Sequence, residues 1–225
     1  MFAKITRKIM LLLSINTSRP IDVDYQGKTI STGIFKKPID APVFVTQANL
    51  KDDLQADLKN HGGEHKAVYA FSSDHYPYWR NTLQNSELKP GSFGENLTIS
   101  GFDESTLHIG DQLSIGQCIL EITQPRVPCF KLGIAVGNKN MPRLFIENFA
   151  TGIYLRVLQE GVIETGNKVE VIKEGTSRVS VQSLFRAYYD KDFQDPRSVL
   201  EKVVLIPELS AEWSKKVTAR LAAGN

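Results

Sequence analysis

Short apolar runs recur between residues 10 and about 174, separated by turns rich in glycine and proline. Runs of this length that contain many β-branched residues and are bounded by turn residues are typical of strands. Gly116 divides one long run into two strands. We therefore expect strands within 10–15, 41–46, 66–72, 111–123, 153–161 and 167–175, the last two joined by a glycine-containing connection.

Two segments of this region have helical patterns instead. Asp74 is a good N-cap for a helix over 75–83, because a short polar side chain accepts an N–H group of the first turn. Pro77 limits that helix to its first turns. Segment 141–150 has a proline near its first position and apolar residues at helical spacing, so it is also predicted to be a helix.

Helical periodicity takes over after residue 175, in segments 180–191, 196–206 and 210–223. The first has one apolar stripe at positions i, i+3, i+4 and i+7, formed by Val181, Leu184, Phe185 and Tyr188. The third follows a suitable N-cap, Ser210, and one face carries Trp213, Val217 and Leu221. The pattern predicts an α+β protein that is mainly β, with a β domain over 10–174 and a three-helix domain over 175–225.

The amino-acid composition of the chain limits the classes of molecule that are expected to bind it. The chain has 225 residues, 41% of them hydrophobic and 23% charged, so it can bury a core without a disulfide or a metal. Its net charge of +2 is too small to favour nucleic acid or a membrane surface as a partner. Any basic site must therefore be a local concentration of charge.

Cysteine use and the N-terminus bear on the compartment. Cys118 and Cys129 are the two cysteines, which do not make a disulfide framework, and a reduced, cytoplasmic setting is expected. Residues 1–15 imitate a signal peptide, but the apolar run is short and no small-residue cleavage site follows it. We interpret 10–15 as a first buried strand. Met10 would serve equally well as the initiating methionine, which would make residues 1–9 an upstream extension.

The segment NHGGEHKAVYAF, residues 60–71, is the first candidate for a functional site. His61 precedes the pair Gly62-Gly63, which exposes backbone N–H groups and lets an anion approach closely, and Lys66 adds a positive charge. The alternative is a tight turn with histidines on the surface. His61 and His65 have a spacing that suits zinc on a helix, but the glycine pair argues against a helix here.

The segment SFGENLTISG, residues 92–101, is the second candidate. Its Gly-Glu-Asn turn enters a strand and can present Asn96 as a hydrogen-bond donor and acceptor. The alternative is an ordinary β-turn, for which glycine and asparagine are common.

The segment EITQPRVPCFKLG, residues 121–133, is the third candidate. Arg126 and Lys131 flank Cys129, and nearby cations favour the thiolate, which is the form that attacks or binds a metal. Two prolines stiffen the chain around Arg126. The alternatives are a small buried hydrophobe at a strand end, or a nucleophile paired with His61 or His75. Cys118 lacks such neighbours and is predicted to lie in the core.

These segments, in this order, resemble the MOSC domain, a family related to the C-terminal part of molybdenum cofactor sulfurases. The resemblance is carried by HGGEHKAV, FGENLTISGFDESTLHIGDQLSIG and QPRVPCFKL. STGIFKKPI and LQADLKNHGG narrow it to the YiiM-like subgroup, which is linked to resistance against 6-hydroxylaminopurine. The C-terminal segments resemble the small three-helix domain of that subgroup, so the likeness covers about residues 10 to 222.

The resemblance implies an irregular β-barrel with a basic cleft that holds the molybdenum cofactor, a pterin bearing a phosphate. It makes Cys129 the molybdenum ligand and the catalytic residue. Local chemistry then suggests the residues that bind the cofactor, namely Arg19, His61, Gly62, Gly63, Lys66, Asn96, Arg126 and Lys131. One departure stands out: the family usually has Gly-Asp where this chain has Asp52-Asp53. We expect that glycine to ease a turn, with no effect on the cofactor site.

The implied reaction is the two-electron reduction of an N-hydroxylated small molecule, such as 6-hydroxylaminopurine, to the amine. Electrons would come from a separate reductase, because the chain has no nicotinamide or flavin fingerprint and no iron–sulfur cysteine cluster. A homodimer is also expected from the subgroup. Two alternatives stay open: a cofactor carrier or sulfur-transfer module without turnover, and a cysteine-dependent hydrolase or transferase without metal.

Overall fold

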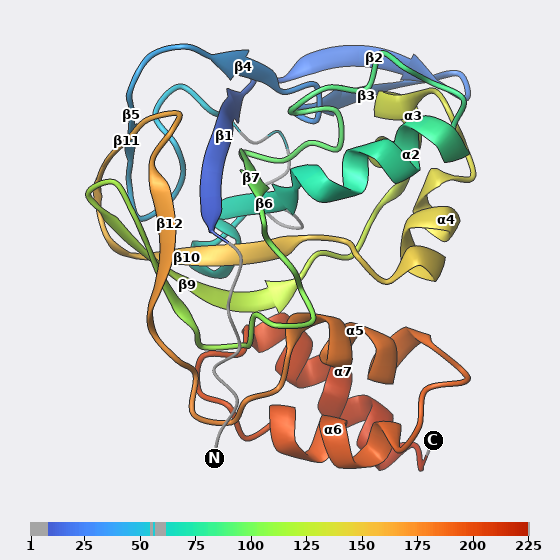
Figure 1. Ribbon diagram of the computed structural model, residues 1–225. Coiled ribbons are helices and arrows are strands. Elements are labelled where there is room, and N and C mark those ends of the chain that lie inside the picture. Colours follow the sequence, from blue (N-terminus) through green and yellow to red (C-terminus); the bar gives the residue numbers. More distant parts are fainter. Residues whose placement is uncertain (1–8, 55, 57–61, 225) are drawn as a thin grey trace.

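The computed structural model describes residues 9–54, 56 and 62–224, and its centre is a β-barrel (Figure 1). The barrel strands are β1 (Met10–Thr17), β6 (Val68–Ser72), β7 (Leu97–Ser100), β8 (Gln112–Ile115), β9 (Cys118–Pro125), β10 (Ile153–Gln159) and β12 (Lys168–Lys173). They run in the order β12-β8-β9-β10-β6-β7-β1, and pairing of β12 with β1 closes the circle. Only β6 and β7 pair in parallel among these neighbours. The expected fold class, a barrel with added helices, is confirmed.

The predicted strands are all present, including a first strand that starts at Met10 and a turn at Gly116. The connection expected between 161 and 167 is partly wrong, because it contains β11 (Gly161–Ile163), which pairs with β5 (Val43–Val45). The sequence pattern also missed the hairpin of β2 (Ile21–Tyr25) and β3 (Lys28–Thr32), and β4 (Lys37–Ile39) at the edge of β1. These strands are largely exposed and therefore lack an apolar run.

The first helix after the barrel strand β6 is α2 (Tyr76–Thr82), with Pro77 in its first turn. Asp74 is not its N-cap, because a 3-10 turn over Ser73–His75 comes first. Ser72 caps that turn, since its hydroxyl accepts the N–H of Asp74 at 3.3 Å. The predicted helix at 141 is confirmed as α4 (Met141–Asn148). One helix was not expected: α3 (Phe130–Val136) begins directly after Cys129.

The C-terminal segments form α5 (Val181–Tyr189), α6 (Pro196–Val203) and α7 (Ala211–Ala222), as predicted. Figure 1 shows them packed together at one end of the barrel, below β9 and β10. The indole of Trp213 is fully buried, with ring contacts to Phe185, Tyr188 and Tyr189. These helices share one continuous cluster of buried hydrophobic residues with the interior of the barrel.

Strand alternation divides β6 and β10 between two hydrophobic clusters. Val68 and Ala70 of β6 point into the barrel, as do Ile153 and Leu155 of β10. The residues between them point outward, where a second cluster, built around the rings of Phe71, Trp79, Phe93 and Phe145, lies under α2 and α4. The outward residues Tyr69 and Tyr154 therefore stand on the outer wall of the barrel, where the candidate site lies.

No helix in the described part of the chain is long and apolar enough to cross a membrane.

Replacing Trp213 with alanine should lower the free energy of unfolding by about 3–5 kcal/mol, because it leaves a large cavity between the helices and the barrel. Urea unfolding followed by circular dichroism measures this. Leu205→Ala is the matched control, because Leu205 lies in the same helical region and is 78% exposed. It should change stability by no more than about 0.5 kcal/mol. Equal losses in both variants would contradict the assigned core.

Candidate functional site

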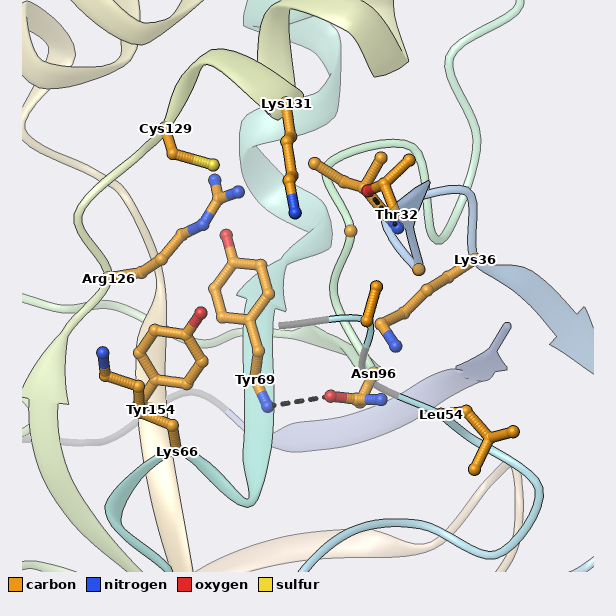
Figure 2. A pocket seen from close by; sticks show the side chains of 14 residues that line it. Thr32, Lys36, Leu54, Lys66, Tyr69, Asn96, Arg126, Cys129, Lys131 and Tyr154 are labelled. Carbon is orange, nitrogen blue, oxygen red and sulfur yellow. Dashed lines mark hydrogen bonds between the residues drawn. The ribbon is translucent and has the colours of Figure 1, made fainter. Parts of the chain in front are cut away.

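An open cavity lies on the outer wall of the barrel. Strands β6 and β10 supply its two tyrosines, the segment after β3 supplies the opposite side, and the start of α3 supplies Cys129 and Lys131 (Figure 2). Its described lining holds four cationic side chains and one thiol, but no carboxylate and no histidine. The lining residues are Thr32, Gly33, Ile34, Lys36, Leu54, Ala56, Lys66, Tyr69, Gly94, Asn96, Arg126, Cys129, Lys131 and Tyr154.

Cys129 lies where the chain turns from β9 into α3. The backbone N–H of Arg126 donates to the carbonyl of Gly152 at 3.1 Å, and Cys129 itself is extended, with φ −118° and ψ 173°. The carbonyl of Cys129 accepts the N–H of Leu132 at 3.0 Å, which starts the helix. The thiol is half-buried in the cavity wall. It is therefore accessible from the cavity and is not an enclosed core residue.

Cys118, in contrast, is enclosed in the core, as predicted. It is fully buried within the barrel, and burial raises the pKa of its thiol to about 11. A thiol in such surroundings stays protonated at neutral pH and neither attacks nor binds a metal readily.

Arg126 places a buried positive charge beside Cys129. Its residue is 5% exposed, and its guanidinium lies over the rings of Tyr69 at 4.9 Å and Phe145 at 5.4 Å. Burial alone would lower its pKa, but Tyr69, Tyr154 and Cys129 raise the pKa above its ordinary value. Its Nη1 atom has no hydrogen-bond partner among the described residues. Because buried polar groups are nearly always bonded, this atom is available to a ligand.

Lys66 reaches the cavity from the 3-10 turn Glu64–Lys66. Its ammonium forms an ion pair with Glu212 of α7 and lies 5.9 Å from the centre of the Tyr154 ring. Gly63 precedes the turn with φ +97°, a conformation that glycine adopts without strain. Neither Gly62 nor Gly63 lines the cavity.

His61 lies outside the described residues. His75, the other partner considered for a nucleophilic cysteine, is not among the described lining residues; its ring bonds to the buried carboxylate of Glu104 at 3.0 Å.

Asn96 lines the cavity, but both ends of its amide are bonded within the wall. Its oxygen accepts the N–H of Tyr69 at 3.1 Å, and its nitrogen donates to Asp53 at 2.9 Å. The same carboxylate forms an ion pair with Lys36 at 2.5 Å. Burial lowers the pKa of Lys36, although Asp53 opposes this shift. A contact between Asn96 and a cofactor therefore stays a prediction.

The rest of the Gly-Glu-Asn turn is structural. Gly94 has φ +78°, and a Cβ there would stand 2.8 Å from Ile34 in the facing wall. The buried carboxylate of Glu95 accepts the N–H groups of Gly91 at 2.8 Å and Phe93 at 3.1 Å. The turn therefore holds the residues after β3 against the barrel.

The two remaining predicted cations differ in position. Lys131 lines the cavity and donates to the carbonyl of Ser31 at 3.3 Å. Arg19 does not line the cavity; its exposed guanidinium lies 3.7 Å from Asp52. Asp52 has φ +66°, a conformation that glycine adopts without strain, which agrees with the turn expected at this position.

Sequence reasoning missed Lys36, Tyr69 and Tyr154. The tyrosines look like ordinary strand residues, and only the outward alternation of β6 and β10 identifies them. Lys36 stands between poorly patterned strands, although the quoted segment STGIFKKPI contains it. Within the described residues, no group of three His, Cys, Asp or Glu side chains is arranged to hold a metal ion.

The model of the MOSC domain family matches residues 57–170 of the chain. The chain belongs to the MOSC domain family. The uncharacterized protein YflK of Bacillus subtilis (strain 168) is 37% identical to it over 204 residues, 90% of each chain. The crystal structure of YiiM from Geobacillus stearothermophilus has a TM-score of 0.78 at 30% identity, and the match covers 94% of this chain and 99% of that one. The expected likeness to YiiM is confirmed.

A third relative is longer. A protein of Gibberella moniliformis (strain M3125 / FGSC 7600), described as a reductase, is 31% identical over 184 residues, which is 80% of this chain and 32% of that protein.

Replacing Asp53 with asparagine should lower the free energy of unfolding by about 3 kcal/mol, because it leaves the ammonium of Lys36 buried without its counter-ion. Urea unfolding checks this. Glu201→Gln is the control, since it breaks an exposed ion pair with Arg197 and should cost under about 1 kcal/mol. The pair Lys36→Met with Asp53→Asn should recover part of the loss, because it removes the unpaired ammonium and keeps a side-chain oxygen as acceptor for the N–H of Ser18. A loss in Asp53→Asn no larger than in the control would contradict the account.

Proposed function

We propose that the cavity binds a molybdenum cofactor and that the protein reduces N-hydroxylated compounds, such as 6-hydroxylaminopurine, to amines. The observation that carries the proposal is the neighbourhood of Cys129. A half-buried thiol stands beside the buried guanidinium of Arg126, whose Nη1 atom has no bonding partner among the described residues. This pair lies in a lining with four cations and no carboxylate.

The described residues fit such a cofactor. A thiolate is a soft ligand that suits molybdenum, and Cys129 is the single thiol of the lining. The other metal ligands must therefore come from the cofactor and solvent. A phosphate-bearing pterin is anionic, and Arg126 provides the planar donor set that matches a phosphate. Lys131 and Lys66 add positive charge on either side.

The aromatic residues complete the binding surface. Tyr69 and Tyr154 have ring centres 5.3 Å apart and form the barrel side of the cavity. Their faces can pack against a flat ring system such as a pterin or a purine. Arg126 lies over Tyr69, so the ring also helps to hold the guanidinium in place.

When bound, the cofactor supplies a two-electron redox centre. Reduction of an N-hydroxylated compound breaks the N–O bond, consumes two electrons and two protons, and releases an amine and water. The role of the chain is to bind and orient, since the described lining has neither a carboxylate nor a histidine that would act as a general acid at neutral pH. Solvent, the cavity ammonium groups and the phenol hydroxyls of Tyr69 and Tyr154 are the proton sources that remain.

Two comparisons support a reductase. The family match covers the strands and turns that carry Lys66, Asn96, Arg126 and Cys129. The relative described as a reductase aligns with this chain over only a third of its own length. This partial coverage agrees with a system in which other protein parts deliver the electrons. We propose that a separate reductase delivers them here.

Protein purified from a host that makes the cofactor should contain molybdenum, and Cys129→Ala should lose nearly all of it together with the reduction of 6-hydroxylaminopurine. Elemental analysis and product chromatography measure the two effects. Cys118→Ala is the matched control, because it removes the other thiol from the enclosed core. Equal molybdenum in wild type and Cys129→Ala would refute the ligand assignment. Bound molybdenum without turnover would favour a carrier.

The purified protein should reduce 6-hydroxylaminopurine with an artificial donor such as dithionite but not with NADPH alone. The reason is that the sequence has no nicotinamide or flavin fingerprint. Absorbance at 340 nm follows NADPH oxidation directly. Sustained NADPH oxidation coupled to amine formation by the chain alone would overturn the requirement for a separate reductase.

A further inference from the structure

One ion pair connects the cavity to the C-terminal helices. The ammonium of Lys66 lines the cavity, with a side chain 14% exposed, and pairs with Oε2 of Glu212 in α7. The other carboxylate oxygen of Glu212 accepts from Lys216 at 2.6 Å. Figure 2 shows Lys66 beside Tyr154, across the cavity from Lys36 and Leu54. Glu212 therefore brings a negative charge to one end of an otherwise cationic site.

Both partners of this ion pair are anchored on strand β9. Ser210, the N-cap of α7, donates its backbone N–H to the carbonyl of Thr123 at 3.3 Å. The hydroxyl of Thr123 donates to the carbonyl of His65 at 2.6 Å, next to Lys66. The fully buried Trp213 holds the first turn of α7 in place. The fold, rather than a loose surface contact, thus brings Glu212 to Lys66.

The ion pair between Lys36 and Asp53 serves a different purpose. Asp53 has a side chain 1% exposed and also accepts from Ser18 and Asn96, so it is part of the wall. The side chain of Glu212 is 39% exposed, and its bonds in the structure are to lysines. Its charge can therefore be separated from Lys66 without opening the core.

We propose that Glu212 competes with anionic ligands for Lys66 and thereby sets how tightly the cavity holds an anion. This inference rests on the proposed function, in which the cavity binds an anionic group. A ligand that reaches Lys66 must share the ammonium with Glu212 and also meets the repulsion of that carboxylate. The repulsion grows in proportion to the charge of the ligand. The competing residue lies beyond residue 170, where the family match ends.

The C-terminal helices would thus adjust a site whose other residues belong to the barrel and the segments around it. Glu212 is a specificity-determining residue in this account. It weakens the binding of doubly charged anions more than that of singly charged anions.

The test uses two simple anions, sulfate and nitrate, titrated into the full-length protein without cofactor at constant ionic strength, with calorimetry as the readout. Glu212→Gln should tighten nitrate binding roughly 5-fold and sulfate binding roughly 25-fold, because the factor for a doubly charged ion is the square of that for a singly charged one. Glu212→Asp, which keeps the charge, should stay near wild type. Glu201→Gln removes the same charge from the exposed surface of α6 and should change neither affinity.

A second set of variants shows whether the effect of Glu212 on anion affinity depends on Lys66. In a Lys66→Met background the gain from Glu212→Gln should become smaller, because competition with Glu212 for the ammonium is gone and only the repulsion by the carboxylate remains. An undiminished gain would overturn competition for Lys66. Sulfate affinities that are equal in wild type and Glu212→Gln would overturn the role of Glu212 while leaving the anion site intact. Failure of both proteins to bind sulfate would overturn the anion site as well.

Discussion

The cavity depends on one buried side chain, the amide of Asn96. Its backbone N–H and its side-chain oxygen both bond to the backbone of Tyr69, which joins β7 to the parallel strand β6. Its side-chain nitrogen holds Asp53, which in turn holds Lys36 and the N–H of Ser18. The amide of Asn96 thus joins Tyr69 to Asp53, and Asp53 joins Lys36 and Ser18 to this network. Asparagine suits this position because it donates and accepts at once without carrying a charge into the wall.

Charge balance in the cavity supports the proposal that it binds an anion. Lys36 is matched by a buried carboxylate and Lys66 by a half-exposed one, whereas Arg126 has no ion pair with a carboxylate among the described residues. An unmatched buried charge is costly, and the faces of Tyr69 and Phe145 offset part of that cost. An anion in the cavity would offset the rest. Binding of an anion would therefore remove an electrostatic cost that the fold leaves at Arg126.

Much of this could be predicted from the sequence, for reasons that differ between elements. Strands such as β1 and β9 have apolar runs because both of their faces are largely buried, and α5 has a clear apolar stripe. The hairpin of β2 and β3 has no such pattern, since its stability comes from pairing at the surface. Cys129, Arg126 and Lys131 are adjacent in sequence, so their neighbourhood was visible. Lys36, Tyr69 and Glu212 join the site through tertiary contacts, which no local pattern reports.

The position of the site on the outer wall of the barrel has a physical reason. The interior is filled by hydrophobic residues of the barrel strands. Outward residues of β6 and β10 are instead covered by loops and short helices, which can bring polar groups without disturbing the core. Cys129 is placed by the turn into α3, Lys36 by the segment after β3, and Lys66 by a turn tied to α7. These three supports come from different parts of the chain, and the bond from Lys131 of α3 to the carbonyl of Ser31 in β3 ties two of them together.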